Sequence, residues 1–157
     1  MKKIFIGKTK FLLFDFALVD DEDFDFLNKW RWHTDNKGYV VRRVRVGGKK
    51  LVVYMHREIM KTPSGMVTDH INGLRNDNRK DNLRVCTDAE NKRNRGKTMN
   101  NSSGFKGVYW QKQIGRWYSR IMVDNKDIYL GTFDTPELAS KAYIKASKKY
   151  HGEFSCE

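Results

Sequence analysis

The feature that most constrains this chain is a run of short elements near its middle. The residues at 67–71 and 83–87 predict two short strands. Between them, the segment 74–82 is polar and has the periodicity of neither a helix nor a strand, so it predicts a loop. Asp88 then suits a helix N-cap, and we expect a helix through about Arg95. The order strand, loop, strand, helix predicts a small mixed α and β module.

Four polar residues along this module suit the hydrolysis of a phosphodiester bond. A hard divalent cation prefers oxygen ligands, which Asp69 and the side-chain carbonyl of Asn91 supply, while waters and a phosphate fill the other positions. Neutral His70 takes a proton from the attacking water, because an unperturbed imidazole titrates near pH ~6.5. Asn82 holds the loop or the imidazole in place. Asn94 competes with Asn91 as a ligand, although the spacing favours Asn91. We expect the cation to be Mg²⁺, with Mn²⁺ as the alternative.

Several strings around these residues form a pattern: 16–23, Gly38-Tyr39, His56-Arg57, Gly65-Met66-Val67, Asp69-His70-Ile71-Asn72-Gly73, Asp77-Asn78-Arg79, Asn82-Leu83-Arg84 and Glu90-Asn91-Lys92-Arg93-Asn94. The pattern covers roughly 15–98. It resembles the HNH endonuclease motif in the form that ends in Asn, and it looks like the HNH homing endonucleases of bacteriophages. The resemblance implies a ββα-metal fold, with His70 as general base, Asp69 and Asn91 as cation ligands and Asn82 as a structural or orienting residue.

The other histidines carry less information. His56 and Arg57 lie in a predicted short helix at 56–61, where two roles stay open: contact with a phosphate, or packing at the start of the helix. His33 and His151 are expected to be structural.

The segment before the motif, 1–55, reads as rich in β-structure. Its apolar stretch at 11–19 is prone to form a strand, and further strands are expected at 30–33, 39–46 and 51–55. The acidic run 20–23 stands where a helix N-terminus stabilises negative charge. We therefore expect that run to cap a helix on a solvated face.

A polar linker, 99–103 at its narrowest, separates this part from a second module. There we expect strands at 107–111, 116–123 and 127–133, followed by a helix that Thr135 caps, with Pro136 at its first position. One helical stripe should lie on the sheet; its members are Leu138, Ala139, Ala142, Tyr143, Ala146 and Tyr150.

The predicted strand 116–123 alternates between two faces. Trp117, Ser119, Ile121 and Val123 should face the helix. The other face then carries two arginines and a tyrosine, which suits phosphates or base edges in a DNA groove. A solvated face is the simplest alternative. The residues we expect on the DNA-contacting face are Arg116, Tyr118, Arg120, Lys106, Tyr109 and Lys112.

Strings in this second module are also distinctive: 103–108, Gly115-Arg116-Trp117, Arg120-Ile121, 130–135, Glu137, Ala139, Ala142-Tyr143 and 149–152. They resemble the apetala/ethylene-response-factor DNA-binding domain over about 102–155. The resemblance implies a three-stranded antiparallel sheet in the major groove, packed by one helix. Tyr109-Trp110 and Met122 stand where plant members favour arginine, so the target sequence does not carry over.

Charge and cysteine content narrow the class of protein. The formal net charge is +12 and is spread along the chain, which fits nucleic acid better than a membrane. No apolar run approaches the ~18 residues of a membrane span. With 2 cysteines, neither a disulfide framework nor a structural zinc is expected, and a cytoplasmic protein is indicated. A basic run, Lys92, Arg93, Arg95 and Lys97, would follow the phosphate backbone; a solvated helix face is the alternative.

Together these observations predict an α+β chain with an N-terminal segment at 1–55, a nuclease core at 56–98 and a DNA-binding domain at 104–155. We expect a monomeric, site-specific endonuclease that acts on double-stranded DNA, in the cytoplasm of a bacterial host if it is encoded by a phage. The alternative is a non-catalytic DNA-binding regulator with a degenerate nuclease fold. An RNA-binding protein is less consistent with the sequence, which lacks the ribonucleoprotein aromatic motifs.

Overall fold

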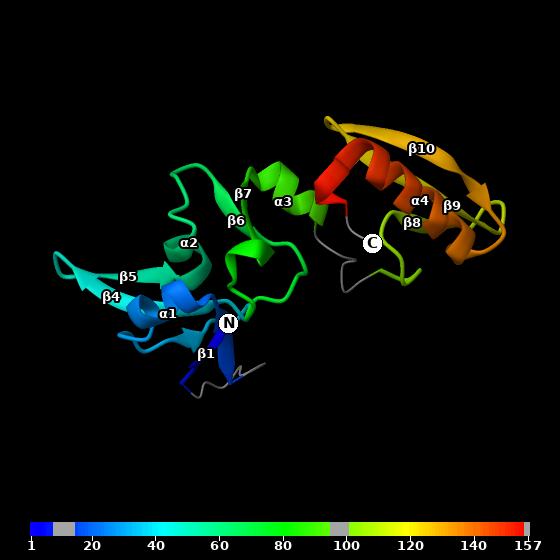
Figure 1. Ribbon diagram of the computed structural model, residues 1–157. Coiled ribbons are helices and arrows are strands. Elements are labelled where there is room, and N and C mark those ends of the chain that lie inside the picture. Colours follow the sequence, from blue (N-terminus) through cyan, green and yellow to red (C-terminus); the bar gives the residue numbers. More distant parts are fainter. Residues whose placement is uncertain (8–14, 95–100, 156–157) are drawn as a thin grey trace. The chain divides into compact units, whose positions relative to one another are not determined.

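The computed structural model describes residues 1–7, 15–94 and 101–155 (Figure 1). The chain divides into two compact units, Met1–Asn91 and Lys92–Glu157. Both contain helices and small antiparallel sheets, so the predicted α+β class is confirmed. Among the described residues, no helix is both long and apolar enough to cross a membrane.

The first unit begins with an antiparallel strand pair, β1–β2, and a three-stranded antiparallel sheet, β3–β4–β5. Two short helices, α1 and α2, accompany them. The bounds are Lys2–Phe5 for β1, Phe16–Val19 for β2, Asp21–Leu27 for α1, His33–Thr34 for β3, Val40–Val46 for β4, Lys49–Tyr54 for β5 and Met55–Ile59 for α2.

One core joins β1, β2, α1, β4 and α2, each of which turns apolar side chains inward. Phe24 of α1 and Ile59 of α2 pack against it from the edge. Its buried members are Ile4, Ile6, Ala17, Val19, Leu27, Trp32, Val40 and Met55.

The predicted strand at 30–33 is wrong, because β3 begins only at His33. Trp32 is buried instead, and its indole Nε1 donates a 2.8 Å hydrogen bond to the carbonyl of Leu27. Its own carbonyl accepts a 2.9 Å bond from the amide of Gly7. Tertiary packing of one large side chain thus replaces the strand that local propensity favours.

The acidic run stands at the N-terminus of α1, as predicted, but makes no side-chain capping bond to the helix. Asp20 has extended backbone angles at the N-cap, and three acidic residues follow in the first turn. The Asp20 carboxylate accepts a 2.8 Å bond from the amide of Lys80 instead of bonding its own helix. Asp21 pairs with the terminal amine of Met1 at 2.6 Å, and Glu22 pairs with the Lys80 ammonium.

The predicted order strand, loop, strand, helix is present at the end of the first unit. β6 and β7 pair antiparallel, and α3 follows β7 and runs into the second unit. The N-cap differs from the prediction: the Glu90 amide donates to the Thr87 hydroxyl at 3.3 Å, and the Glu90 carboxylate accepts from the Thr87 amide at 2.8 Å. This reciprocal capping box makes Thr87, rather than Asp88, the capping residue. The bounds are Val67–His70 for β6, Lys80–Asn82 for the 3-10 turn η1, Leu83–Cys86 for β7 and Asp88–Asn94 for α3.

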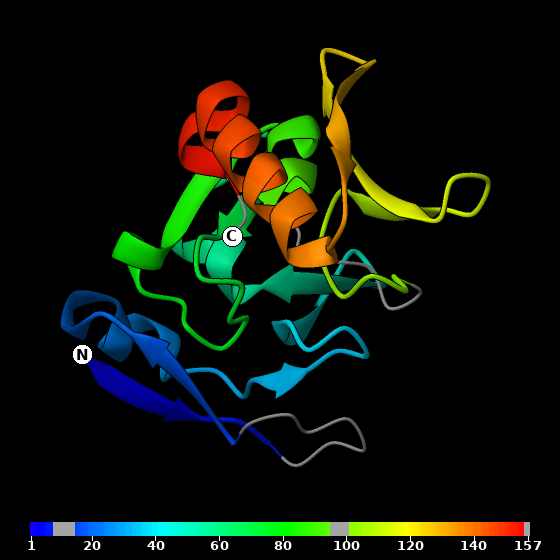
Figure 2. The same ribbon diagram turned by 90° about the vertical axis from the view of Figure 1, so that its right-hand side faces the viewer.

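The second unit is a three-stranded antiparallel sheet with β9 at its centre and α4 packed on one face (Figures 1 and 2). The Thr135 hydroxyl accepts a 3.3 Å bond from the Leu138 amide, and Pro136 begins the helix, as predicted. The short turn η2 follows. The bounds are Val108–Gln111 for β8, Arg116–Val123 for β9, Lys126–Phe133 for β10, Pro136–His151 for α4 and Gly152–Phe154 for η2.

The face that α4 buries is rotated from the predicted stripe. Leu138 and Tyr150 are exposed, whereas Ser140 and Ser147 are buried. Gly107 explains the close approach: a Cβ atom there would lie 2.1 Å from the ring of Tyr143. Ala139, Ser140, Ala146 and Ser147 therefore line the contact together with the Tyr143 ring.

The segment predicted as a linker lies partly outside the described residues, which resume at Asn101. Asn101 donates a 2.7 Å bond to the carbonyl of Phe105, and the Ser103 hydroxyl donates a 2.9 Å bond to the carbonyl of Val108. Residues 101–103 therefore belong to the second unit by their hydrogen bonds.

Candidate functional site

Asp69 and Arg84 face each other across the β6–β7 pair. Arg84 donates from Nε at 3.0 Å and from Nη2 at 2.8 Å, both to Oδ2 of Asp69. The two side chains are only 8% and 11% exposed, so the Asp69 charge is removed from water but compensated by the guanidinium.

His70 ends β6 and is buried among aromatic rings. Its ring centroid lies 5.0 Å from that of His56, edge to face, and 6.1 Å from that of Tyr39. Burial lowers the pKa of His70 below its usual 6.5, although the side chains of Asn78 and Asp69 oppose that shift. The imidazole is therefore neutral at neutral pH, the form in which it accepts a proton.

His56 is the second histidine of this cluster. Burial lowers its pKa to about 3. Its ring lies 5.2 Å from Tyr39 and 5.5 Å from Tyr54, and Nδ1 has no hydrogen bond from any described residue. The neighbouring Arg57 donates to the carbonyl of Met66 at 2.9 Å, so its guanidinium holds the turn before β6.

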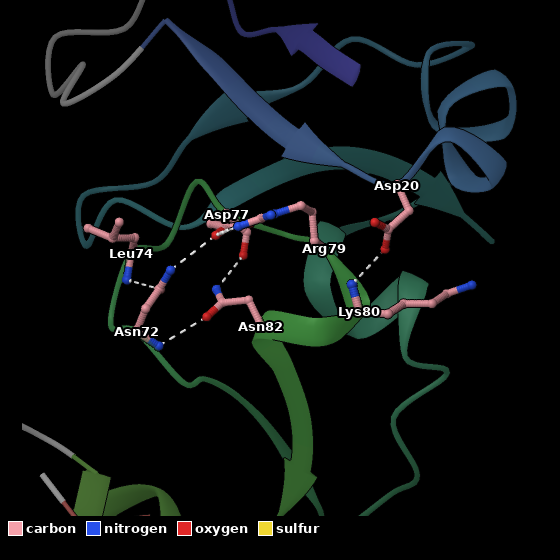
Figure 3. A network of polar contacts seen from close by, with 7 residues as sticks. All are labelled: Asp20, Asn72, Leu74, Asp77, Arg79, Lys80 and Asn82. Atoms are coloured by element: carbon pink, nitrogen blue, oxygen red, sulfur yellow. Dashed lines mark hydrogen bonds and ion pairs between the residues drawn. The ribbon is translucent and has the colours of Figure 1, made fainter. Parts of the chain in front are cut away.

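Asn82 ties the long polar loop to the start of β7 (Figure 3). Its amide nitrogen donates to the carbonyl of Asp77 at 2.8 Å, and its amide oxygen accepts from the amide of Asn72 at 3.0 Å. The backbone of Ile71 also donates to the carbonyl of Asn82 at 2.9 Å. These bonds fix the backbone that follows His70.

The loop is also anchored through its acidic member, Asp77. Arg79 donates two bonds to its carboxylate, at 2.7 and 2.6 Å, and the Asn72 side chain donates a third at 3.0 Å (Figure 3). Asp77 lies beside Leu18 of β2, whose carbonyl accepts a 2.8 Å bond from the amide of Asn78. A segment without regular structure is thus held against the core of the first unit.

Asn91 lies on α3 and is the last residue of the first unit. Its backbone amide donates to Thr87, and its side-chain amide takes no hydrogen bond from the described residues. Oδ1 of Asp69 accepts neither of the two bonds described above from Arg84, which both go to Oδ2. A carboxylate oxygen and an amide oxygen are a donor set that suits a hard divalent cation. No cluster of three or more His, Cys, Asp or Glu side chains suited to a metal is found among the described residues. The competing Asn94 ends α3 in the second unit.

Cys86 lies nearby on β7 as a buried free thiol. Burial raises its pKa to about 11, so the thiolate that nucleophilic or metal-binding chemistry needs is disfavoured. Cys156 lies outside the described residues.

In the second unit, the alternation predicted for β9 is observed. Ser119 and Ile121 are buried on the helix side, whereas Arg116, Arg120 and Met122 are exposed on the other. Both arginines carry an acidic partner at the surface. The Arg116 guanidinium pairs with Asp134 at 2.5 Å, and that of Arg120 pairs with Asp127 at 2.8 Å.

Three tyrosines cross this exposed face, one on each strand. The rings of Tyr109 and Tyr118 are stacked with centroids 5.4 Å apart, and those of Tyr118 and Tyr129 are stacked at 6.4 Å. Neighbouring strands lie about 4.8 Å apart, so rings that stack across them stand up from the sheet. They present ring edges and hydroxyls outward, which suits phosphates, sugars and methyl groups better than base stacking.

The other residues predicted to contact DNA are spread apart. Lys112 is exposed in the turn after β8. Lys106 donates to the carbonyl of Arg93. Burial lowers the pKa of His151 near the end of α4, away from the tyrosine face, and these two cations add to the shift. Arg95 and Lys97 lie outside the described residues. His151 is structural, as expected, since its Nε2 lies 3.0 Å from the carbonyl oxygen of Met122.

Sequence reasoning missed three residues around the candidate site: Arg84, Asn78 and Tyr39. Arg84 and Asn78 belong to strings that resembled the motif, but nothing in the sequence gives their contacts with Asp69 and His70. Period-two alternation does put Asp69 and Arg84 on one face once the strand register is known. The register itself is set by the loop and is not visible in the sequence.

Comparison with known proteins finds one matching family model in each part of the chain. A family model for HNH endonucleases matches residues 61–93, and one for the AP2 domain matches residues 103–153. Protein 3.8 of Escherichia phage T7 is 30% identical over 93 residues, which are 59% of this chain and 76% of that protein. No solved structure matches the chain.

The plant relatives match over shorter stretches of the chain. The AP2-like ethylene-responsive transcription factor TOE2 of Arabidopsis thaliana is 39% identical over 61 residues, 39% of this chain and 13% of that protein. The factor AIL5 of the same plant is 47% identical over 53 residues, 32% of this chain and 10% of that protein. This chain therefore spans only a small part of these plant proteins.

Both matches imply DNA binding, and the first adds a nuclease-type domain. The chain belongs to the HNH endonuclease family and carries an AP2 domain after its HNH segment.

Proposed function

We propose that this protein is a site-specific homing endonuclease that hydrolyses a phosphodiester bond of double-stranded DNA with the help of a divalent cation. The observation that carries the proposal is the adjacent pair Asp69 and His70 at the end of β6, with a compensated carboxylate and a neutral imidazole. A non-catalytic DNA-binding surface has no need for a buried neutral histidine beside a buried carboxylate.

In this proposal His70 is the general base. Burial keeps its ring neutral, so a ring nitrogen accepts a proton from the attacking water. Packing against the rings of Tyr39 and His56 limits the orientations of the imidazole. Asn82 has an orienting role, because its amide fixes the backbone on either side of the loop that follows His70.

Asp69 and Asn91 would hold the cation, through Oδ1 of the carboxylate and the amide oxygen. Mg²⁺ is the cation we propose, because both donors are hard oxygens, with Mn²⁺ as the alternative. When bound, it would stabilise charge on the phosphate and on the leaving oxygen. Arg84 fixes the orientation of the carboxylate by donating two hydrogen bonds to its other oxygen, Oδ2.

The AP2 unit would hold the target sequence. Its exposed face carries Arg116, Arg120 and the three stacked tyrosines, and we propose that this face lies in a DNA groove. Tethering two DNA-contacting units in one chain raises the local concentration of the cutting site at the held sequence. That arrangement would make a monomer sufficient.

Supercoiled plasmid DNA tests the proposal. Wild-type protein with Mg²⁺ should convert it to nicked or linear forms, and EDTA should stop the reaction. His70→Ala should abolish conversion. The matched control is His33→Ala, a histidine of the same unit outside the cluster, which should retain it. Equal conversion by wild type and His70→Ala, or none by either, would refute the nuclease.

A second function, a non-catalytic DNA-binding regulator, is favoured by one observation: the AP2 unit matches named transcription factors at 39–47% identity, above the 30% of the phage relative. On that reading the chain binds a defined DNA sequence and leaves it intact under every cation tested. The plasmid experiment separates the two functions.

A further inference from the structure

We propose that the β4–β5 hairpin is a further DNA-contacting element, whose cationic face holds the duplex beside the candidate site. The inference rests on the proposed nuclease function only for the position at which the DNA is cut. Neither matched family segment, 61–93 or 103–153, includes this hairpin.

The hairpin projects from the first unit as a two-stranded ribbon. Figure 1 shows it, in cyan, extending beyond the other elements of that unit. Val46 pairs with Lys49 across a two-residue turn, Gly47-Gly48, whose φ angles are +55° and +77°. Positive φ at both central residues matches the twist of the strands, which gives a regular ribbon up to its tip.

One face of the ribbon is cationic. Residues directly paired across antiparallel strands share a face, and Arg45 pairs with Lys50 while Arg43 pairs with Val52. Arg43, Arg45 and Lys50 are all exposed. Within the described part of the chain, no acidic side chain forms an ion pair with any of them.

The opposite face is built differently. Arg42 donates to the carboxylate of Glu58 at 3.2 and 2.7 Å and lies 4.2 Å from the ring of Trp30. Its charge is thus used to fix the base of the ribbon to α2. Lys49 is the other cation of this face and lies near the tip, exposed. One face of the ribbon therefore carries three exposed cations, whereas the other carries one exposed cation and one arginine that is already paired.

The cationic face continues toward the candidate site. Val41 pairs with Tyr54 on that face, and the Tyr54 ring lies 5.5 Å from His56. The His56 ring in turn lies 5.0 Å from His70. A duplex resting on Arg43 and Arg45 would therefore lead to the proposed general base.

Length and charge favour duplex DNA as the occupant. At ~3.4 Å per residue, the ribbon reaches about 20 Å from Val40 to Val46 along β4. That is the length of about six base pairs, since each strand carries one phosphate per ~3.4 Å of axis. The major groove of DNA admits a two-stranded ribbon, and cations on one face reach its phosphates.

The test measures how DNA affinity depends on salt, with the full chain, a linear DNA duplex of arbitrary sequence and EDTA present so that no bond is cut. The logarithm of the binding constant falls linearly with the logarithm of the salt concentration, and each lost phosphate contact makes this negative slope shallower by ~0.9. Arg45→Ser with Lys50→Ser should therefore reduce the steepness of the slope by about 2. Affinity near 0.1 M salt should fall at least about 10-fold.

The control removes the same charge elsewhere in the first unit. Lys29→Ser with Lys49→Ser, both at exposed positions off the cationic face, should keep the wild-type slope. The exchange Arg45→Lys with Lys50→Arg keeps both positive charges, so this variant should show the wild-type salt slope. If the Arg45/Lys50 and Lys29/Lys49 variants have the same slope, or if wild type does not bind the duplex, the proposal is overturned.

Cleavage in Mg²⁺ separates this inference from the nuclease. If wild type cuts no DNA but the slopes separate as expected, the nuclease fails and the ribbon contact stands. If wild type cuts and the slopes do not separate, the ribbon contact alone fails.

Discussion

Arg84 pairs with Asp69 from the opposite position on the next strand and donates two hydrogen bonds to a single oxygen of its carboxylate. The pair joins β6 to β7 directly beside His70, the proposed general base. The same two side chains therefore contribute to the stability of this strand pair and to the candidate site. Breaking a buried ion pair is costly because it leaves one charge unpaired.

Arg84→Met should therefore lower the free energy of unfolding by about 3 kcal/mol, since a buried carboxylate then loses its partner. In an Asp69→Asn background the same change should cost clearly less. Urea unfolding of the four proteins in this double-mutant cycle measures the coupling. Equal costs in both backgrounds would show that the two side chains do not depend on each other.

The stability of the first unit should fall in mild acid because of His56. Its pKa in the folded chain is about 3, against 6.5 when unfolded, so the unfolded chain binds the proton first as pH falls. Stability from this group is complete above about pH 6.5 and is lost from there toward pH 3, by about 1.4 kcal/mol per pH unit at most.

His56→Gln removes this titration, so thermal unfolding measured at pH 7 and pH 5 should differ less for the variant than for wild type. His33, His70 and His151 also have lowered pKa values and act in the same direction, which is why the comparison uses the difference between proteins. A variant with an unchanged pH dependence would contradict the burial of a neutral His56.

Gly107→Ala should destabilise the second unit by at least about 2 kcal/mol. The added Cβ would lie 2.1 Å from the Tyr143 ring and 2.8 Å from the carbonyl oxygen of Arg120, at a φ of +69°. Gly115→Ala is the matched control, because its φ is +61° but nothing lies within 4 Å. If urea unfolding shows similar losses of stability for both variants, then backbone strain, and not the contact with α4, explains why glycine is needed at position 107.

Arg116→Ala with Arg120→Ala should weaken DNA binding and lower its salt slope by up to about 2. The rate of a single turnover at saturating protein should not change, because the chemistry is proposed for the other unit. Lys141→Ala with Lys145→Ala, exposed cations on α4, serves as the control of equal charge. If the Arg116/Arg120 variant loses the single-turnover rate, the second unit takes part in catalysis, which contradicts the proposal.

How far the sequence predicts the structure depends on whether a feature is local. The two faces of β9 and the Thr135 cap with Pro136 are local patterns, and both are as predicted. The buried face of α4 is not, because it depends on a glycine in the turn before β8, Gly107, that lets Tyr143 approach. Trp32 likewise prevents a predicted strand by packing into the core.

The candidate site divides in the same way. Residue types and order suggested Asp69, His70, Asn82 and Asn91, since these are the donors and bases that such chemistry uses. The pairing of Asp69 with Arg84 and the ring contact of His70 with His56 join elements that are distant in the chain. Such contacts follow from strand register and from the path of the loop, and the sequence states neither.

The central claim is that His70 acts in bond cleavage, and single-turnover cleavage of DNA in Mg²⁺ tests it most directly. His70→Ala should slow the cleavage step by at least about 100-fold while the affinity for DNA stays at the wild-type value. A variant that cleaves at the wild-type rate, or a wild-type protein that binds DNA and never cuts it, would contradict the account.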